Sequence, residues 1–209
     1  MFPEEETTEE ENGMKRGFAL ALALSLMLCA AGACAATLAT EKQNTYVYPT
    51  GGSGPVYVLE FERAKFVGGQ QLPVYSGPGK EYYRAAGGYA KCNTDEEIYI
   101  AGKEGTWAFV LYWRSNGGTR TGYVDLSQLQ YTYKTSDMDF AYRKAKITKD
   151  CAMTDDPTLV KENLAYLGAG EYVTLLAYYT DHHEWAYVEA MAGNVPLRGF
   201  VLKDYVSVE

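Results

Sequence analysis

Three short segments of this chain return later in the same order. They are "AKF" at 64–66 and "AKI" at 145–147, "TWAFV" at 106–110 and "EWAYV" at 184–188, and "TGYV" at 121–124 and "RGFV" at 198–201. The offsets are 81, 78 and 77 residues, a drift that changes in loop length would cause. A chain of 209 residues is long enough for two small domains. The repeat therefore predicts two copies of one domain, at 63–133 and 143–209.

Each copy is predicted to consist of short strands with no amphipathic helix of useful length. The chain has 19 tyrosines and 21 glycines beside only 7 prolines, a composition typical of strands and turns. "SNGG" at 115–118 predicts a hairpin turn, and "DLSQL" at 125–129 predicts one 3₁₀ turn. The predicted strands are 64–67, 72–75, 97–101, 107–114, 119–124 and 130–133 in the first copy, and 145–148, 172–178, 185–190 and 198–202 in the second. Five or six such strands predict a small, strongly bent barrel, so the expected fold class is all-β with two tandem barrels.

The N-terminal region is predicted to be an export signal. Lys15 and Arg16 precede an apolar run that ends in small residues, and Ala33-Cys34-Ala35 fits the rule for cleavage before Ala36. We therefore expect an acidic extension at 1–13, a signal peptide at 14–36 and a polar linker at 37–62, with a short strand at 46–48. Two alternatives are an uncleaved anchor helix and a lipoprotein carrying its lipid on Cys34. All three place the rest of the chain outside the cytoplasm, so the protein is expected to be secreted or associated with the cell envelope.

Charge and cysteine content exclude some classes of protein. The net charge is −8, and the part from Glu41 onward still carries −4 (17 basic and 21 acidic residues), which leaves no electrostatic footprint for nucleic acid. No helix with a basic face is present to bind a membrane surface. With two cysteines inside the signal, only Cys92 and Cys151 remain. These two can pair with each other or stay as buried thiols, but they cannot form a disulfide framework.

The repeated segments resemble the bacterial SH3-like domain family. "PVYSGPGKEYY" at 73–83 is similar to the first conserved block of the family, "GTWAFVLYW" to its central strand and "RTGYVDLSQL" to its closing segment. The second copy keeps "EWAYVEA" and "RGFVLKDYV" but has "CAMTDDPTLV" in place of the glycine loop. The resemblance implies non-catalytic modules of exported proteins, which often bind cell-wall peptide or peptidoglycan.

The loop "SGPG" at 76–79 is interpreted as a turn. A phosphate-binding loop needs backbone amides at the start of a helix, but no helix pattern follows here, and Pro78 has no amide hydrogen. Gly77 and Gly79 are expected to adopt backbone angles that other residues resist. A rigid turn of this kind could present Tyr82 and Tyr83 to a peptide or a sugar.

Alternation along the strand at 107–114 predicts which of its faces is buried. One face carries Trp107, Phe109 and further large residues, and the other carries Ala108, Val110 and Tyr112. In the second copy the face with Trp185 also carries Glu189, and a glutamate is rarely buried without a partner. The alanine–valine face is therefore expected to be the core. The tryptophan face is expected to be partly wet, forming either a surface platform or the cover of an open barrel end.

No constellation of residues predicts catalysis or metal binding. "DHHEW" at 181–185 holds the only two histidines, and neighbours on a strand point to opposite faces, so a solvated turn is expected rather than a metal site. Cys92 and Cys151 lack an activating environment, and the chain has no Gly-x-Ser-x-Gly motif. The carboxylate pairs Glu96-Glu97 and Asp155-Asp156 lie in turn-like segments of barrels too small for a catalytic cleft. We expect no enzymatic activity, no cofactor and no metal.

The sequence thus predicts an exported binding module for cell-wall peptide or peptidoglycan. The aromatic groove is predicted in the first copy, with the candidate residues Tyr75, Tyr82, Tyr83, Trp107 and Tyr112. The alternative is a protein–protein adaptor or spacer tethered to the envelope, which would bind a partner protein through a sheet edge or exposed aromatic residues.

Overall fold

The computed structural model describes residues 56–115, 117–158, 163–181 and 183–209, and for 181 and 183 only the backbone. All of them belong to one compact unit, residues 39–209. The acidic extension, the signal peptide, the linker up to residue 55 with its expected strand at 46–48, and His182 lie outside the described residues. No helix among the described ranges is long and apolar enough to span a membrane.

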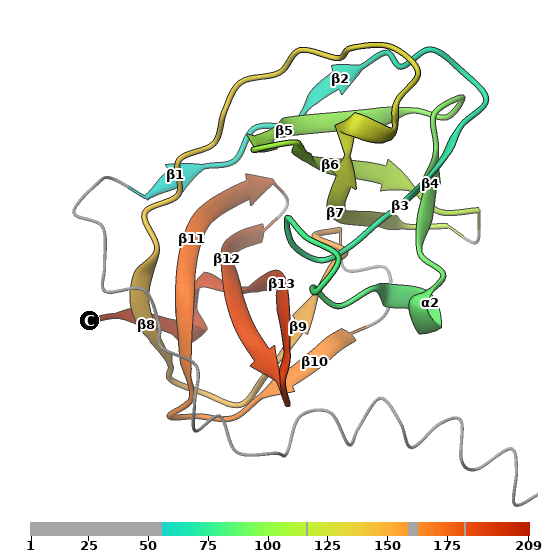
Figure 1. Cartoon of the computed structure of the whole chain (residues 1–209). Coiled ribbons are helices and arrows are strands. Elements are labelled where there is room, and N and C mark those ends of the chain that lie inside the picture. The colour runs from blue at the N-terminus through green and yellow to red at the C-terminus, as the bar shows by residue number, and fades with distance from the viewer. Residues whose placement is uncertain (1–55, 116, 159–162, 182) are drawn as a thin grey trace, which may run out of the picture. The chain divides into compact units, whose positions relative to one another are not determined.

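The fold is all-β with antiparallel sheets, as the sequence predicts; the parallel contacts are one short strand pair and one isolated bridge (Figure 1). We call residues 62–128 the first β unit and residues 143–208 the second β unit. The elements of the first are β2 (Glu62–Ala64), β3 (Gln71–Pro73), α2 (Ala85–Gly88), β4 (Lys91–Asn93), β5 (Ile98–Glu104), β6 (Trp107–Trp113), β7 (Thr119–Asp125) and the 3₁₀ turn η1 (Leu126–Gln128). The elements of the second are β8 (Arg143–Ile147), β9 (Cys151–Thr154), β10 (Asn163–Leu167), β11 (Tyr172–Asp181), β12 (His183–Ala192), β13 (Val195–Leu202), η2 (Lys203–Tyr205) and β14 (Val206–Val208).

The two β units have the same strand order. In the second unit the order is β10-β9-β13-β12-β11-β8-β14, and β9 joins β13 through the single pair Thr154 and Phe200. In the first unit, β4-β3 and β7-β6-β5-β2 are separate sheets, joined by an isolated bridge between Tyr75 and Tyr123. Each strand from β2 to β7 thus has a counterpart six places later, in keeping with the repeated segments.

A glycine in each copy allows this joint between strands. An added Cβ on Gly122 would lie 2.7 Å from the carbonyl oxygen of Tyr75, and one on Gly199 would lie 2.9 Å from that of Thr154. The glycines of "TGYV" and "RGFV" are therefore required by the close approach of a second backbone.

The segment before the first unit crosses to the second. β1 (Tyr57–Val58) pairs in parallel with Ala177 and Tyr178 of β11, and the amide of Leu59 donates to the carbonyl of Tyr178 at 2.7 Å (Figure 1). Residues 57 and 58 lie within the stretch expected to be linker.

Most of the predicted strands form, but several strands were not predicted and one predicted strand is absent. β4, β9 and β10 were not predicted, because each is short and shows no clear alternation. Residues 130–133 form no strand, whereas their counterpart β14 pairs with β8. The side chain of Gln70 bonds to the backbone there instead: its amide nitrogen donates to the carbonyl of Gln128 at 3.1 Å, and its oxygen accepts from the amide of Gln130 at 3.1 Å.

The two predicted turns are present. The hairpin between β6 and β7 is closed by the amide of Arg114, which donates to the carbonyl of Gly118 at 3.1 Å. Positive φ occurs at Gly117 and Gly118. The carboxylate of Asp125 caps η1 by accepting from the amide of Ser127 at 3.0 Å.

Gly77 and Gly79 correct an expectation, because neither has a φ in the left-handed region. An added Cβ on Gly77 would lie 2.1 Å from the ring of Tyr82, so glycine is needed there for packing rather than for its backbone angles. The turn itself is closed by the amide of Ser76, which donates to the carbonyl of Tyr83 at 2.8 Å.

Each unit has its own core on the predicted face. Ala108 and Val110 are fully buried in the first unit, and Ala186, Val188 and Ala190 in the second. A third cluster, which we call the interface core, combines residues of both units and of the segments before and between them: Leu59, Phe109, Tyr123, Phe140, Leu176, Ala177, Trp185, Tyr187 and Phe200. The tryptophan faces of β6 and β12 are therefore mostly buried against each other.

Candidate functional site

The first β unit has a groove of about 510 Å³ between β4, α2 and the end of β6. Its rim carries two large exposed aromatic side chains, Tyr89 at 80% and Trp113 at 50% exposure. Lys91, Asn93 and Arg114 add polar groups to the same lining. An aromatic rim with amide and cationic groups between its walls suits a ligand that has both flat apolar surfaces and hydrogen-bonding groups.

Tyr112 and Arg120 lie deeper in the groove, where they form a cross-strand pair on β6 and β7. Both are buried, and burial is the largest cause that raises the pKa of the Tyr112 hydroxyl above its usual value. The guanidinium of Arg120 pairs with the carboxylate of Asp155 at 2.7 Å, and both side chains are almost inaccessible to water. Asp155 follows β9, so the deep part of the groove is anchored to the second β unit.

Burial raises the pKa of Asp155 to about 6, although Arg120 and Arg114 lower it. Two more contacts fix the same place: the hydroxyl of Thr119 donates to the carboxylate of Asp156 at 2.7 Å, and the amide of Thr121 donates to the carbonyl of Asp155 at 2.7 Å. The carboxylate pair Asp155-Asp156, expected to lie in a turn, is therefore buried and joins the two units.

The structure places one of the five candidate residues in the groove and the other four outside it. Tyr112 lines the groove. Tyr75 and Trp107 contact each other edge to face with ring centroids 5.6 Å apart, and Trp107 packs against the interface core. Tyr83 packs against the cores of both units, and its amide donates to the carbonyl of Pro196 at 2.9 Å.

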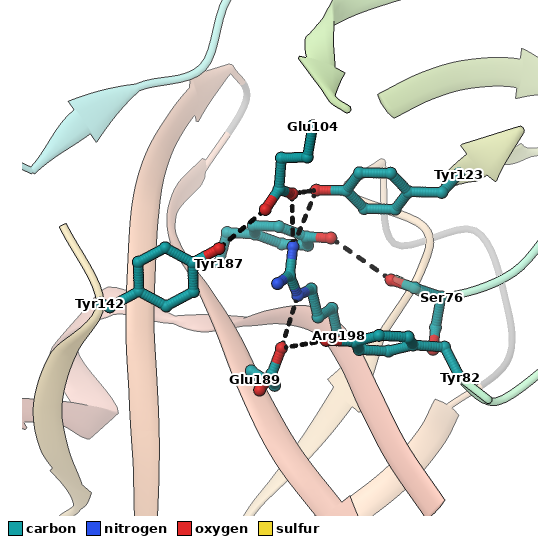
Figure 2. A network of polar contacts seen from close by, with 8 residues as sticks. All are labelled: Ser76, Tyr82, Glu104, Tyr123, Tyr142, Tyr187, Glu189 and Arg198. Atoms are coloured by element: carbon teal, nitrogen blue, oxygen red, sulfur yellow. Dashed lines mark hydrogen bonds and ion pairs between the residues drawn. The ribbon is translucent and has the colours of Figure 1, made fainter. Parts of the chain in front are cut away.

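Tyr82, the fifth candidate, belongs to a buried polar network between the units (Figure 2). Its hydroxyl donates to the carboxylate of Glu189 at 2.9 Å, and burial is the main cause that raises the pKa of this hydroxyl. The ring of Tyr82 also lies under the guanidinium of Arg198, 5.3 Å from its centroid. Of the five candidates, only Tyr112 contributes to the groove, and the structure does not gather the others into one open surface.

Arg198 is the centre of this network (Figure 2). It pairs with Glu189 at 2.7 Å on the neighbouring strand and with Glu104 of the first unit at 2.6 Å. The hydroxyls of Tyr123 and Tyr142 donate to the two carboxylate oxygens of Glu104, at 2.6 and 2.7 Å. A buried guanidinium with two carboxylates and hydroxyl partners satisfies the charge on each member, as a stable interior ion pair requires.

This network corrects the expectation that the tryptophan face is wet. Glu189 is only 3% exposed, because Arg198 and Tyr82 satisfy its carboxylate. Trp185 is 2% exposed, and its indole nitrogen donates to the carbonyl of Pro157 at 3.1 Å, so it is no surface platform. Only Trp113, at the end of β6, is exposed as expected.

Sequence reasoning missed Tyr89 and Trp113 as groove residues. Trp113 lies on the strand face that was expected to be partly wet, and this expected exposure could have identified it as a groove residue. Tyr89 follows a four-residue helix that contains three residues with positive φ, and no periodicity predicts where such a side chain lies.

The described residues hold neither a cluster of metal ligands nor a reactive thiol. None of them form a group of three or more histidine, cysteine or acidic side chains that could hold a metal ion. Cys92 and Cys151 are free thiols, and burial raises their pKa to about 12 and about 11. Both are therefore protonated at neutral pH and are poor nucleophiles.

The chain matches no protein-family model, and searches of curated proteins and of solved structures found no match either.

Proposed function

We propose that this chain is an exported, non-catalytic protein of two SH3-like barrels that binds cell-wall peptide or peptidoglycan. The observation that carries the proposal is the groove of the first β unit, with exposed Tyr89 and Trp113 on its rim. Exposed aromatic rings beside polar side chains are typical of sites for peptides and sugars. The repeated segments and the signal-like N-terminus support the family and the location.

The surroundings of the groove are consistent with a support for it. Three of the five aromatic residues expected to form the groove, Tyr82, Tyr83 and Trp107, pack instead where the two units meet. The second unit supplies Asp155 beneath the groove through its ion pair with Arg120. In this proposal the first unit recognises the ligand and the second holds the floor of the groove in place.

Sedimentation with purified cell wall tests the binding. The double variant Tyr89→Ala/Trp113→Ala is expected to weaken binding by about 5- to 150-fold, because losing aromatic contacts costs roughly 0.5–1.5 kcal/mol each. Tyr57→Ala/Tyr131→Ala is the matched control, since these two tyrosines are also exposed but do not line the groove. Equal loss in both variants, or no binding by the parent protein, would reject the proposed site. The turbidity of the wall suspension should stay constant, and a fall would point to a hydrolase.

Mass spectrometry of the exported protein tests its location. We expect a mature chain that begins near Ala36. A lipid on Cys34 would show that the protein is anchored as a lipoprotein instead. An intact Met1 or Met14 on exported protein would reject the cleaved signal.

One observation favours an envelope-tethered adaptor or spacer as the second candidate. The two units share an interface core and two buried ion pairs, Arg120–Asp155 and Arg198–Glu104, which make a stiff body. A spacer would not bind wall material by itself but would retain a partner protein from the same envelope. Absence of wall binding together with specific capture of one envelope protein would favour this candidate.

A further inference from the structure

β4 is a short strand with one free edge, and this edge lies in the groove. Among the described strands, β4 pairs only with β3. Cys92 lines the groove, although the whole residue is only 2% exposed. The residues on either side, Lys91 and Asn93, line the groove as well.

The register of β3 and β4 decides which backbone groups point outward. The amide of Val74 donates to the carbonyl of Ala90 at 3.0 Å, and the amide of Thr94 donates to that of Gln70 at 2.9 Å. In an antiparallel ladder, hydrogen-bonded pairs alternate with non-bonded pairs. Leu72 and Cys92, midway between these contacts, therefore form a hydrogen-bonded pair.

Lys91 and Asn93 occupy the alternate positions, so their backbone groups point away from β3. Lys91 faces Pro73, which has no amide hydrogen to exchange in any case. The carbonyl of Asn93 accepts from the amide of Glu96 at 3.1 Å. The amide and carbonyl of Lys91 and the amide of Asn93 thus remain directed toward the groove, like the edge of a sheet that can accept another strand.

From this geometry we infer that the groove binds an extended peptide as an additional strand on the free edge of β4. The inference rests on the proposed function and assigns recognition to the peptide part of the wall rather than to its sugar chains. Backbone hydrogen bonds to Lys91 and Asn93 hold the peptide, and its side chains lie against Tyr89 and Trp113.

The charges of the groove do not choose between the two parts of the wall. Lys91 and Glu96 both line it. Arg114 and Arg120 both act on the buried carboxylate of Asp155. The free edge does choose, because a peptide backbone carries the amides and carbonyls of a strand and a sugar chain does not.

The test compares intact cell wall, glycan strands freed of peptide by an amidase, and the released wall peptides. We expect the protein to bind intact wall and released peptides and to leave the glycan strands in solution. Binding to intact wall and equally to glycan strands would overturn the inference and leave the proposed function standing. Failure to bind intact wall would overturn both.

Amide hydrogen exchange measured by NMR with the released peptides gives a second readout. The amides of Lys91 and Asn93 should exchange at least about tenfold more slowly with peptide bound, because each gains a hydrogen bond. The amide of Cys92, which points to β3, is the internal control and should not change. Binding without protection at 91 and 93 would show a groove ligand that adds no strand.

A pair of variants separates the contribution of the Lys91 backbone amide to peptide binding from that of its side chain. Lys91→Ala removes the charge and keeps the amide, whereas Lys91→Pro also removes the outward amide. Lys91→Pro should bind released peptides about tenfold more weakly than Lys91→Ala, the cost of roughly one hydrogen bond. Equal affinity in the two variants would contradict strand addition. If Lys91→Pro does not fold, the exchange measurement on the parent protein decides.

Discussion

Phe109 of β6 stacks on Tyr187 of β12, with ring centroids 4.7 Å apart and an interplanar angle of 27°. These two residues occupy the same place in "TWAFV" and "EWAYV", so each copy meets its counterpart at the equivalent position. Tyr123 and Phe200, which are equivalent in "TGYV" and "RGFV", flank the pair at 4.9 and 5.0 Å. The two units therefore associate through the same aromatic surface, as the subunits of a symmetric dimer do.

Truncation at the centre of this stack should destabilise the whole described fold. Phe109 is fully buried, so Phe109→Ala is expected to lower the free energy of unfolding by about 3–5 kcal/mol. Tyr131→Ala, at 60% exposure, is the control and should change it by less than about 0.5 kcal/mol. Urea denaturation followed by tryptophan fluorescence measures both. Separate transitions for the two units in the parent protein would contradict a shared core.

Substituting Arg198 alone should destabilise the fold more than substituting it together with Glu104 and Glu189. Arg198→Met leaves Glu104 and Glu189 without their cation in a dry interface, with an expected loss of about 3–5 kcal/mol. The triple variant with Glu104→Gln and Glu189→Gln should recover a substantial part of that loss, because no uncompensated charge remains. The same denaturation series compares the two. A triple variant that is less stable than Arg198→Met would show that the network stabilises the fold by more than the pairing of its charges.

Asp155 should make stability depend on pH in a defined window. Its pKa is raised from 3.8 to about 6 in the folded protein, so folding takes up a proton between these values. The protonated form is favoured by folding, and this contribution is lost as the pH rises from about 4 to about 6. The parent protein should therefore lose stability relative to Asp155→Asn across that window and show a constant difference above it. Parallel curves for the two proteins from pH 4 to 7 would contradict the raised pKa.

Gly122 and Gly199 should respond alike to substitution by alanine. Each added methyl group would meet a backbone oxygen at less than 3 Å, which the strands can relieve only by moving apart. We expect a loss of about 1–3 kcal/mol for each variant. Gly168→Ala is the control, because its nearest neighbour is the flexible side chain of Glu171 at 3.2 Å. Thermal unfolding measures all three, and a tolerant Gly199 beside an intolerant Gly122 would argue against equivalent joints.

The sequence by itself determined the all-β class, the recurrence of the strands, and the alanine–valine face of each core. These follow from local patterns: alternation sets the face of a strand, and a repeated segment repeats its environment. The sequence did not determine what covers the tryptophan faces of β6 and β12. Glu189 was taken as a sign of solvent, but its partners Arg198 and Tyr82 are separated from it by 9 and 107 residues.

Only the tertiary structure decided that the tryptophan faces meet, that most of the predicted groove residues join the units, and that the open groove lies beside β4. A buried charge is stable only where its partners lie next to it in the folded protein. A strand keeps a free edge only if no other strand pairs with that edge. Both depend on contacts between distant parts of the chain, which no local pattern of residues records.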